Sequence, residues 1–283
     1  MMPKRWSVCF CPVKLMNLKY FRPMKKALFL VLLYFVCQFV ATLPFILWHL
    51  VQGTSGSMSL TDPMELSLSV LLSNVLMIAH LLFWKDVRFG MHSFVEVPFR
   101  MLLVCVPLVL SAMFVLNAFN EWLDLPNWGE AAFLGMSRNV WGVLAITIGA
   151  PLVEELLFRG GVMNSLHRAG YGPRAMILWS ALIFGVFHLN PAQIPFAFLL
   201  GLLLGWLYYR TGSLLPGILC HFINNSLGVI LLRSDHADTR LVDLVGGTGP
   251  LCVGIALAII VFVCSFFYAR RCLKRVNRTF SEQ

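Results

Sequence analysis

The chain has 283 residues, of which 59% are hydrophobic and only 12% are charged. A soluble domain carries about 25% charged residues, so the composition excludes an ordinary soluble protein and indicates a membrane protein. The formal net charge is +9, but the basic residues gather in the two tails and in alternate loops, as membrane topology requires. We therefore expect a lipid bilayer, and no nucleic acid, as the partner of this basic surface.

Long apolar segments recur from one end of the chain to the other, which predicts an all-α fold, a polytopic integral membrane helical bundle. A helix needs about 20 apolar residues to cross a bilayer core. Eight transmembrane helices are predicted, at residues 27–50, 66–84, 99–120, 139–166, 174–189, 193–209, 214–232 and 250–269. The fifth and sixth are short, so we expect them to be tilted or incompletely exposed to lipid. The first span starts too late and is too long for a cleaved signal peptide.

The basic residues also predict the orientation of the chain. Of the 22 Lys and Arg residues, only Arg138, Arg233 and Arg240 fall on the side opposite the two tails. Because basic residues favour the cytoplasmic side, residues 1–26 and 270–283 are predicted to be cytoplasmic tails. Residues 27–269 form the transmembrane bundle between them, and an even number of spans agrees with this orientation.

Two adjacent glutamates and an arginine interrupt the fourth predicted span, in the stretch PLVEELLFRGG. An ionisable side chain in hydrocarbon costs about 2.5–3.5 kcal/mol on insertion scales, so such residues face a bundle interior or a water-filled cavity. Glu155 and Arg159 are four residues apart on one helix face and can form an ion pair. Glu154 is rotated by about 100° from Glu155, which predicts that it is free for a different task. The structural alternative is that all three residues anchor the helix near the membrane interface.

Two histidines and an asparagine are the other polar residues of interest within the apolar spans. Glu154 and His188 each lie 17 residues from Tyr171, at the centre of the predicted turn HRAGYGPR, so they are expected at equal depth in a helical hairpin. His221 and Asn225 are four residues apart and follow the next turn, RTGS, by about 15–21 Å of helix. A lone histidine is more often a hydrogen-bonded core residue, but this set can meet in one layer if the helices are neighbours.

These residue types suit water-mediated attack on a peptide carbonyl. A carboxylate in such a bundle can act as a general base, and a neighbouring imidazole can orient or polarise the water. An amide and an imidazole on one helix face can donate hydrogen bonds to a developing oxyanion. No serine or cysteine stands in a comparable motif with a base, which disfavours a covalent nucleophile.

The sequence resembles the CPBP family of intramembrane proteases, also called the CAAX protease and bacteriocin-processing or ABI family. The family pattern EExxxR, FxxxH and HxxxN reads here as EELLFR from Glu154 to Arg159, FGVFH from Phe184 to His188 and HFINN from His221 to Asn225. All three motifs match in order, within residues 150–228. The resemblance implies a glutamic endopeptidase and a helical membrane fold, and we expect the bacterial cell (inner) membrane.

The resemblance also implies a role for each motif residue. Glu154 would be the base that activates water together with His188, while His221 and Asn225 would stabilise the oxyanion. Glu155 and Arg159 would be supporting residues. The substrate would be a peptide or membrane protein, membrane-attached or lipidated, because eukaryotic members trim prenylated CAAX proteins and some bacterial members act in bacteriocin maturation or immunity.

Two other functions are weighed against this one. Glu154, His188 and His221 would be a sufficient ligand set for a catalytic zinc, but the HExxH helix pair is absent, so no metal or other cofactor is expected and a zinc-dependent protease is the less favoured alternative. A non-catalytic membrane scaffold or immunity protein would keep the fold without needing all three motifs.

The loops favour a cytoplasmic route to the predicted site. His167, Arg168, Arg174 and Arg210 flank the two turns on the side of the tails. Basic residues around an entrance would attract carboxylates or lipid headgroups, so we expect the substrate to arrive from that side. The positive-inside rule alone would equally explain these residues.

Overall fold

The computed structural model describes residues 18–53, 62–84, 97–236 and 239–273. Within these ranges the ordered elements are helices and no strand is present, which confirms the predicted all-α class. Residues 1–17 and 274–283 of the predicted tails lie outside the described residues, as does the basic segment 85–96 between the second and third spans.

Within the described residues, four helices precede the segment that carries the two glutamates. They are α1 (Leu18–Val51), α2 (Pro63–Phe83), α3 (Phe99–Leu123) and the short α4 (Glu130–Ser137). The start of α2 follows from its sequence, because the Asp62 side chain accepts hydrogen bonds from the Met64 and Glu65 amides and Pro63 occupies the first helical turn.

The fourth span is one continuous helical run, Val140–Arg168, but its geometry changes along its length. It consists of α5 (Val140–Leu144), the π-helix η2 (Ala145–Gly149), α6 (Ala150–Glu155), the π-helix η3 (Leu156–Met163) and α7 (Asn164–Arg168). The remaining elements are α8 (Pro173–Phe187), α9 (Ile194–Thr211), α10 (Leu215–Leu232), α11 (Leu241–Leu244) and α12 (Thr248–Leu273).

Seven helices in the described part of the chain are long and apolar enough to cross a membrane. The remaining predicted span, the fifth at 174–189, corresponds to α8, an apolar helix of 15 residues; it is one of the two spans expected to be short. The polytopic helical bundle is therefore confirmed.

Some predicted boundaries differ from the structure. Helix α1 begins at Leu18, inside the segment predicted as a tail, and α12 continues to Leu273, beyond the predicted end at 269. Hydropathy marks the part of a helix that lies in hydrocarbon, and a helix need not stop at the membrane surface. The short helices α4 and α11 were not predicted.

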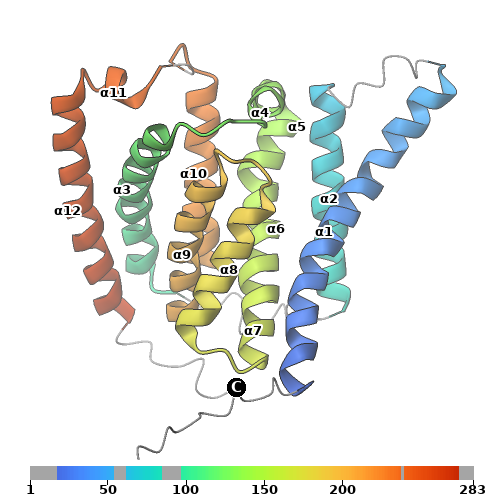
Figure 1. The fold of residues 1–283 in the computed structure, drawn as a ribbon, viewed down its shortest axis with the longest axis horizontal. Coiled ribbons are helices and arrows are strands. Elements are labelled where there is room, and N and C mark those ends of the chain that lie inside the picture. Colours follow the sequence, from blue (N-terminus) through green and yellow to red (C-terminus); the bar gives the residue numbers. More distant parts are fainter. Residues whose placement is uncertain (1–17, 54–61, 85–96, 237–238, 274–283) are drawn as a thin grey trace, which may run out of the picture.

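The two described ends of the chain lie at the same end of the bundle (Figure 1). The first turn of α1, the last turn of α12 and the connection between α7 and α8 are at this end, whereas α4 and α11 lie at the other. The Ala192 amide donates to the Pro126 carbonyl at 3.2 Å, which joins the α8–α9 loop to the segment before α4. An even number of membrane crossings places both chain ends on the same side, as seen here. The cytoplasmic location of the ends stays a prediction.

The hairpin of α8 and α9 packs closely against η3 and brings the second and first motifs together. Two glycines permit this approach. A Cβ atom on Gly185 would stand 2.9 Å from the Ile194 carbonyl oxygen, and one on Gly201 would stand 3.0 Å from the Phe184 ring. Phe184 and Phe158 meet edge to face with 5.0 Å between ring centroids, in a buried apolar cluster that also contains Tyr34.

Candidate active site

The two glutamates lie on α6, between two π-helical segments. Pro151 has no N–H to donate within the helix, and its ring crowds the carbonyl four residues earlier. The π-helix η2 ends directly before this point, at Gly149, and η3 contains the pair Gly160 and Gly161. Such π-helical turns recur at functional sites, and here they flank the helical turn that carries both carboxylates.

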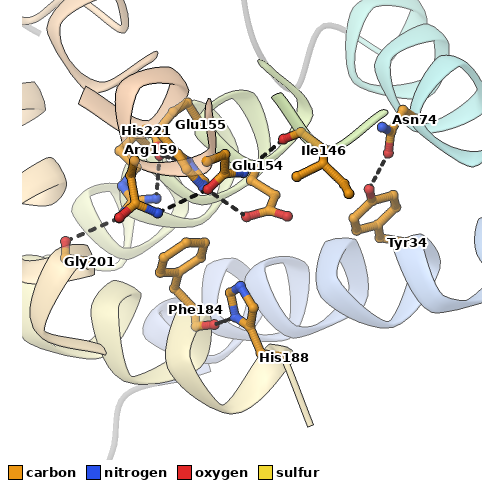
Figure 2. Close-up of polar contacts among 12 residues, drawn as sticks. Tyr34, Asn74, Ile146, Glu154, Glu155, Arg159, Phe184, His188, Gly201 and His221 are labelled. Carbon is orange, nitrogen blue, oxygen red and sulfur yellow. Dashed lines mark hydrogen bonds and ion pairs between the residues drawn. The ribbon is translucent and has the colours of Figure 1, made fainter. Parts of the chain in front are cut away.

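Glu155 and Arg159 form the ion pair that their spacing predicts. Arg159 Nη1 donates to Glu155 Oε1 at 2.8 Å, and both side chains are fully buried. Arg159 Nη2 donates to the Gly201 carbonyl at 3.1 Å, and the guanidinium carbon lies 4.7 Å from the centroid of the Phe184 ring. The charge of Glu155 is thus compensated within the protein core (Figure 2).

His221 of α10 lies between the two glutamates (Figure 2). Its Nδ1 is 3.3 Å from Glu155 Oε1 and its Nε2 is 3.8 Å from Glu154 Oε2. A carboxylate only accepts hydrogen bonds, so Nδ1 carries the hydrogen towards Glu155. Gly217, one turn earlier, allows this approach of α10, because a Cβ atom there would stand 2.6 Å from Glu155 Oε2.

Glu154 has different surroundings from its neighbour. The residue is 8% exposed, and its Oε2 atom has no hydrogen-bond partner among the described residues. The contact with His221 is within ion-pair range but too long for a hydrogen bond. Glu155 Oε2 is likewise buried without a partner in the described part of the chain, so what distinguishes Glu154 is its place on the wall of a cavity. There its carboxylate can meet a water molecule or a substrate, as the prediction of a separate task for Glu154 requires.

His188 lies at the C-terminal end of α8 and is oriented by its own helix. Its Nδ1 is 2.8 Å from the Phe184 carbonyl oxygen, and because a carbonyl only accepts, Nδ1 is the donor. The Nε2 of the neutral ring is then an acceptor. The rings of Phe184 and His188 meet edge to face at 5.0 Å, which restrains the imidazole further.

Asn225 is held by two neighbouring polar groups. Its Nδ2 donates to the Ile146 carbonyl of η2 at 2.8 Å, and its Oδ1 accepts from Asn224 Nδ2 at 3.0 Å. The amide nitrogen has two hydrogens, so one N–H remains beyond the bond to Ile146. This hydrogen bond connects the HxxxN motif to the helical run that carries the EExxxR motif.

A cavity of about 490 Å³ joins these residues. Its wall includes Glu154, His188, His221 and Asn225, so the structure brings together the four residues that sequence predicts to be catalytic. Glu155 and Arg159 lie behind this wall. The motif residues thus meet in one layer of the bundle, as their equal depth in the membrane predicted. The catalytic role of each residue stays a prediction.

The cavity extends away from the turns that carry the basic residues. Its wall continues to the end of the bundle at α4, with the side chains of Asn117, Asn120, Asn127, Glu130 and Gln193. None of His167, Arg168, Arg174 and Arg210 is on this wall, and Arg168 instead donates to Ser165 at 3.1 Å. This cavity does not supply the expected basic entrance at the chain-end side, and the route of the substrate stays a prediction.

Sequence reasoning missed the contribution of the first helices. Tyr34 and Gln38 of α1 lie on the cavity wall, and Asn74 of α2 accepts a hydrogen bond from the Tyr34 hydroxyl. Gln38 and Asn74 are amides inside predicted spans, which was a usable signal. Their convergence on the motif residues could not be inferred from spacing.

The residues that could share a metal ion are Glu154, His188 and His221. In the described part of the chain, no three His, Cys, Asp or Glu side chains are grouped closely enough to hold one. The zinc alternative is decided by metal analysis of the purified protein, where one tightly held zinc per chain would favour it.

Comparison with known families matches residues 136–227 to the family described as type II CAAX prenyl endopeptidase Rce1-like. This class of membrane protein agrees with the helical bundle and with the three motifs, all of which lie inside the matched segment. The resemblance seen in the sequence is therefore confirmed over residues 136–227. No curated protein and no solved structure matches the chain.

Proposed function

We propose that the protein is an intramembrane endopeptidase in which Glu154 and His188 activate the water that cleaves a peptide bond. One observation carries this proposal. Glu154, unlike its neighbour Glu155, lies on the same cavity wall as His188, His221 and Asn225. The Rce1-like family supports a CAAX-type protease.

The first step is the attack of water on the substrate carbonyl carbon. The water oxygen forms a bond to this carbon, and Glu154 takes one proton from the water as general base. The neutral His188 ring accepts at Nε2, because Nδ1 donates to the Phe184 carbonyl. His188 therefore orients the water while Glu154 receives the proton.

The second requirement is stabilisation of the negative oxygen that develops in the tetrahedral intermediate. Asn225 offers the N–H that is not used by Ile146. His221 Nδ1 already faces Glu155, so donation from His221 Nε2 to the oxyanion requires the imidazolium form. Donors fixed before the reaction stabilise such an oxyanion without reorganisation, and Glu155 with Arg159 supplies this fixation.

The intermediate then collapses. The carbonyl double bond re-forms, the carbon–nitrogen bond breaks, and the leaving amine takes the proton that Glu154 holds. The products are a new C-terminal carboxyl group and a new N-terminal amine, and Glu154 is again ready to accept a proton. No further reactant is needed.

The cavity wall favours a substrate with an extended, uncharged backbone. Amide side chains from four helices or their caps line it: Gln38, Asn117, Asn120, Gln193, Asn224 and Asn225. Each amide group donates and accepts, as a peptide group does, and Asn120 Oδ1 is buried without a partner among the described residues. A membrane helix satisfies its own backbone, so the segment to be cut must unwind, and these amides can replace its lost hydrogen bonds.

Mass spectrometry of peptides released from membranes tests the proposed function. Membranes that contain the wild-type protein are compared with membranes that contain Glu154→Gln, and Glu65→Gln is the matched control. Glu65 is paired with His49 at 3.1 Å and is not on the cavity wall. We expect peptides that wild type and Glu65→Gln release and Glu154→Gln does not. Identical peptides from all three samples would contradict the proposal and favour a non-catalytic scaffold or immunity protein.

A further inference from the structure

A tyrosine from outside the family-matched segment belongs to the wall of the catalytic cavity. Tyr34 lies on α1 and is 2% exposed, and it lines the cavity together with Glu154 and His188. Glu154 is among the charged and polar groups that act on its hydroxyl, along with Ser73 and Gln38. The phenol and the predicted base therefore share one cavity and act on each other electrostatically.

The direction of the Tyr34 hydroxyl is determined by α2. The hydroxyl donates its hydrogen to Asn74 Oδ1 (Figure 2). Asn74 is 2% exposed and sits against the catalytic helical run, since a Cβ atom on Gly149 would stand 2.7 Å from Asn74 Nδ2. Because its hydrogen is engaged by Asn74, the Tyr34 oxygen presents lone pairs, and it is an acceptor for a group in the cavity.

The Tyr34 ring is also restrained from the side of the second motif. It stacks on Phe187 with ring centroids 5.4 Å apart and planes 9° apart. Phe187 in turn meets the His188 ring edge to face at 6.0 Å. Tyr34 is therefore coupled by packing to the helix end that carries His188, and by hydrogen bonding to the helix that contacts Gly149.

An attacking water molecule must direct a lone pair at the substrate carbonyl, which requires both of its hydrogens to be held. In the proposed function Glu154 receives one of them. We propose that Tyr34 positions the attacking water by sharing its second hydrogen with His188 Nε2 in a bifurcated hydrogen bond, so that the oxygen lone pair faces the carbonyl. This inference rests on the proposed function and adds a water-positioning residue to it.

The test is a kinetic comparison of Tyr34→Phe with Tyr208→Phe in the full-length protein. The substrate is a synthetic, internally quenched version of a peptide whose release depends on Glu154. Tyr34→Phe keeps the ring and its stacking on Phe187 and removes only the hydroxyl. Tyr208 is the matched control, because it is a buried tyrosine bonded to Asn164 Oδ1 at 3.2 Å and does not line the cavity.

We expect Tyr34→Phe to lower kcat by about 10- to 100-fold, the range that misplacement of a reacting group produces, with KM changed less than about twofold. Tyr208→Phe is expected to keep the wild-type kcat. A kcat for Tyr34→Phe equal to that of Tyr208→Phe would overturn the inference, as would an effect on KM alone. A failure of Glu154→Gln to abolish cleavage would refute the proposed function instead, which separates the two failures.

A second variant tests the same inference through a different residue. Asn74→Ala releases the Tyr34 hydroxyl from its acceptor, so we expect a smaller loss of kcat than in Tyr34→Phe. In the double variant, Asn74→Ala should cause no additional loss, because two residues that act through one group are not additive. Additive losses would show that Asn74 acts independently of Tyr34 and would overturn the inferred mechanism.

Discussion

At the scale of single residues, the site depends on the different fates of two adjacent glutamates. Successive residues of a helix are rotated by about 100°, so neighbouring side chains of one type face different partners. Glu155 faces Arg159 and His221, which both contact its Oε1 atom within the core. Glu154 lies on the cavity wall, and Glu155 does not. The same carboxylate group is an ion-pair partner in one position and the predicted base in the other.

This difference predicts opposite effects for the same substitution. Glu154→Gln should abolish peptide release while the protein keeps its thermal stability in detergent. Glu155→Gln should destabilise the protein by about 3–5 kcal/mol, because it leaves the fully buried Arg159 without its charged partner. Thermal unfolding and peptide release are measured on both variants. A stable but inactive Glu155→Gln protein beside an active Glu154→Gln protein would reverse the assignment.

The guanidinium of Arg159 predicts a second effect. Its two terminal nitrogens contact Glu155 and the Gly201 carbonyl separately, a geometry that a lysine ammonium cannot reproduce. Arg159→Lys should therefore lower stability by about 1–3 kcal/mol, the cost of a lost buried hydrogen bond. Arg168→Lys, at an exposed arginine bonded to Ser165, is the control and should unfold as wild type does. Equal unfolding temperatures for the two variants would contradict the proposed importance of the two separate contacts of the guanidinium group.

At the scale of helices, the site requires α10 to approach α6 more closely than ordinary side chains permit. Gly217 provides this approach opposite Glu155, one turn before His221. In the α8–α9 hairpin, Gly185 and Gly201 have the same function. Small residues at such positions let membrane helices come together, and here they bring the motif residues within reach of one another.

Gly217→Ala should therefore separate α10 from the glutamates. The added methyl group would stand 2.6 Å from Glu155 Oε2, and relief of such overpacking costs about 1–3 kcal/mol. Gly228→Ala on the same helix adds a methyl group with no atom within 4 Å. Since alanine is the better helix former, the Gly228 variant should be at least as stable as wild type in the same thermal unfolding experiment. A Gly217 variant that matches it would contradict the close contact.

At the scale of the whole molecule, the cavity extends towards one end of the bundle and the described chain ends lie at the other. The cavity wall reaches α4 through Glu130, whereas both described ends of the chain lie at the opposite end of the bundle (Figure 1). Combined with the predicted cytoplasmic tails, this arrangement favours a substrate that reaches the catalytic layer from the non-cytoplasmic side. The amide-lined wall then meets the unwound segment before Glu154 does.

Cysteine labelling in intact cells tests this orientation. A membrane-impermeant maleimide should label Glu130→Cys, at the cavity mouth, from outside. Gly172→Cys, in the exposed turn before α8, should react only after the membrane is permeabilised. The parent protein gives the background from its own cysteines. Labelling of Gly172→Cys from outside would invert the topology and return the cavity mouth to the cytoplasmic side.

The sequence by itself was sufficient for the features that depend on local spacing. The length of apolar helices follows from the thickness of the bilayer, so the spans were predictable, including the short α8. The Glu155–Arg159 pair follows from the four-residue repeat of one helix face, and equal distances from a turn predicted that Glu154 and His188 share a layer. The three motifs, which lie inside the family-matched segment 136–227, required no tertiary information.

Only the tertiary structure decided which helices surround that layer. In a membrane bundle most faces are apolar, so hydropathy does not distinguish a face that meets lipid from one that meets another helix. For this reason the sequence could not show that Tyr34 reaches the cavity, or that Gly201 accepts a bond from Arg159. It also could not show which end the cavity faces. These features depend on contacts between segments far apart in the chain, which the spacing of residues along the sequence does not specify.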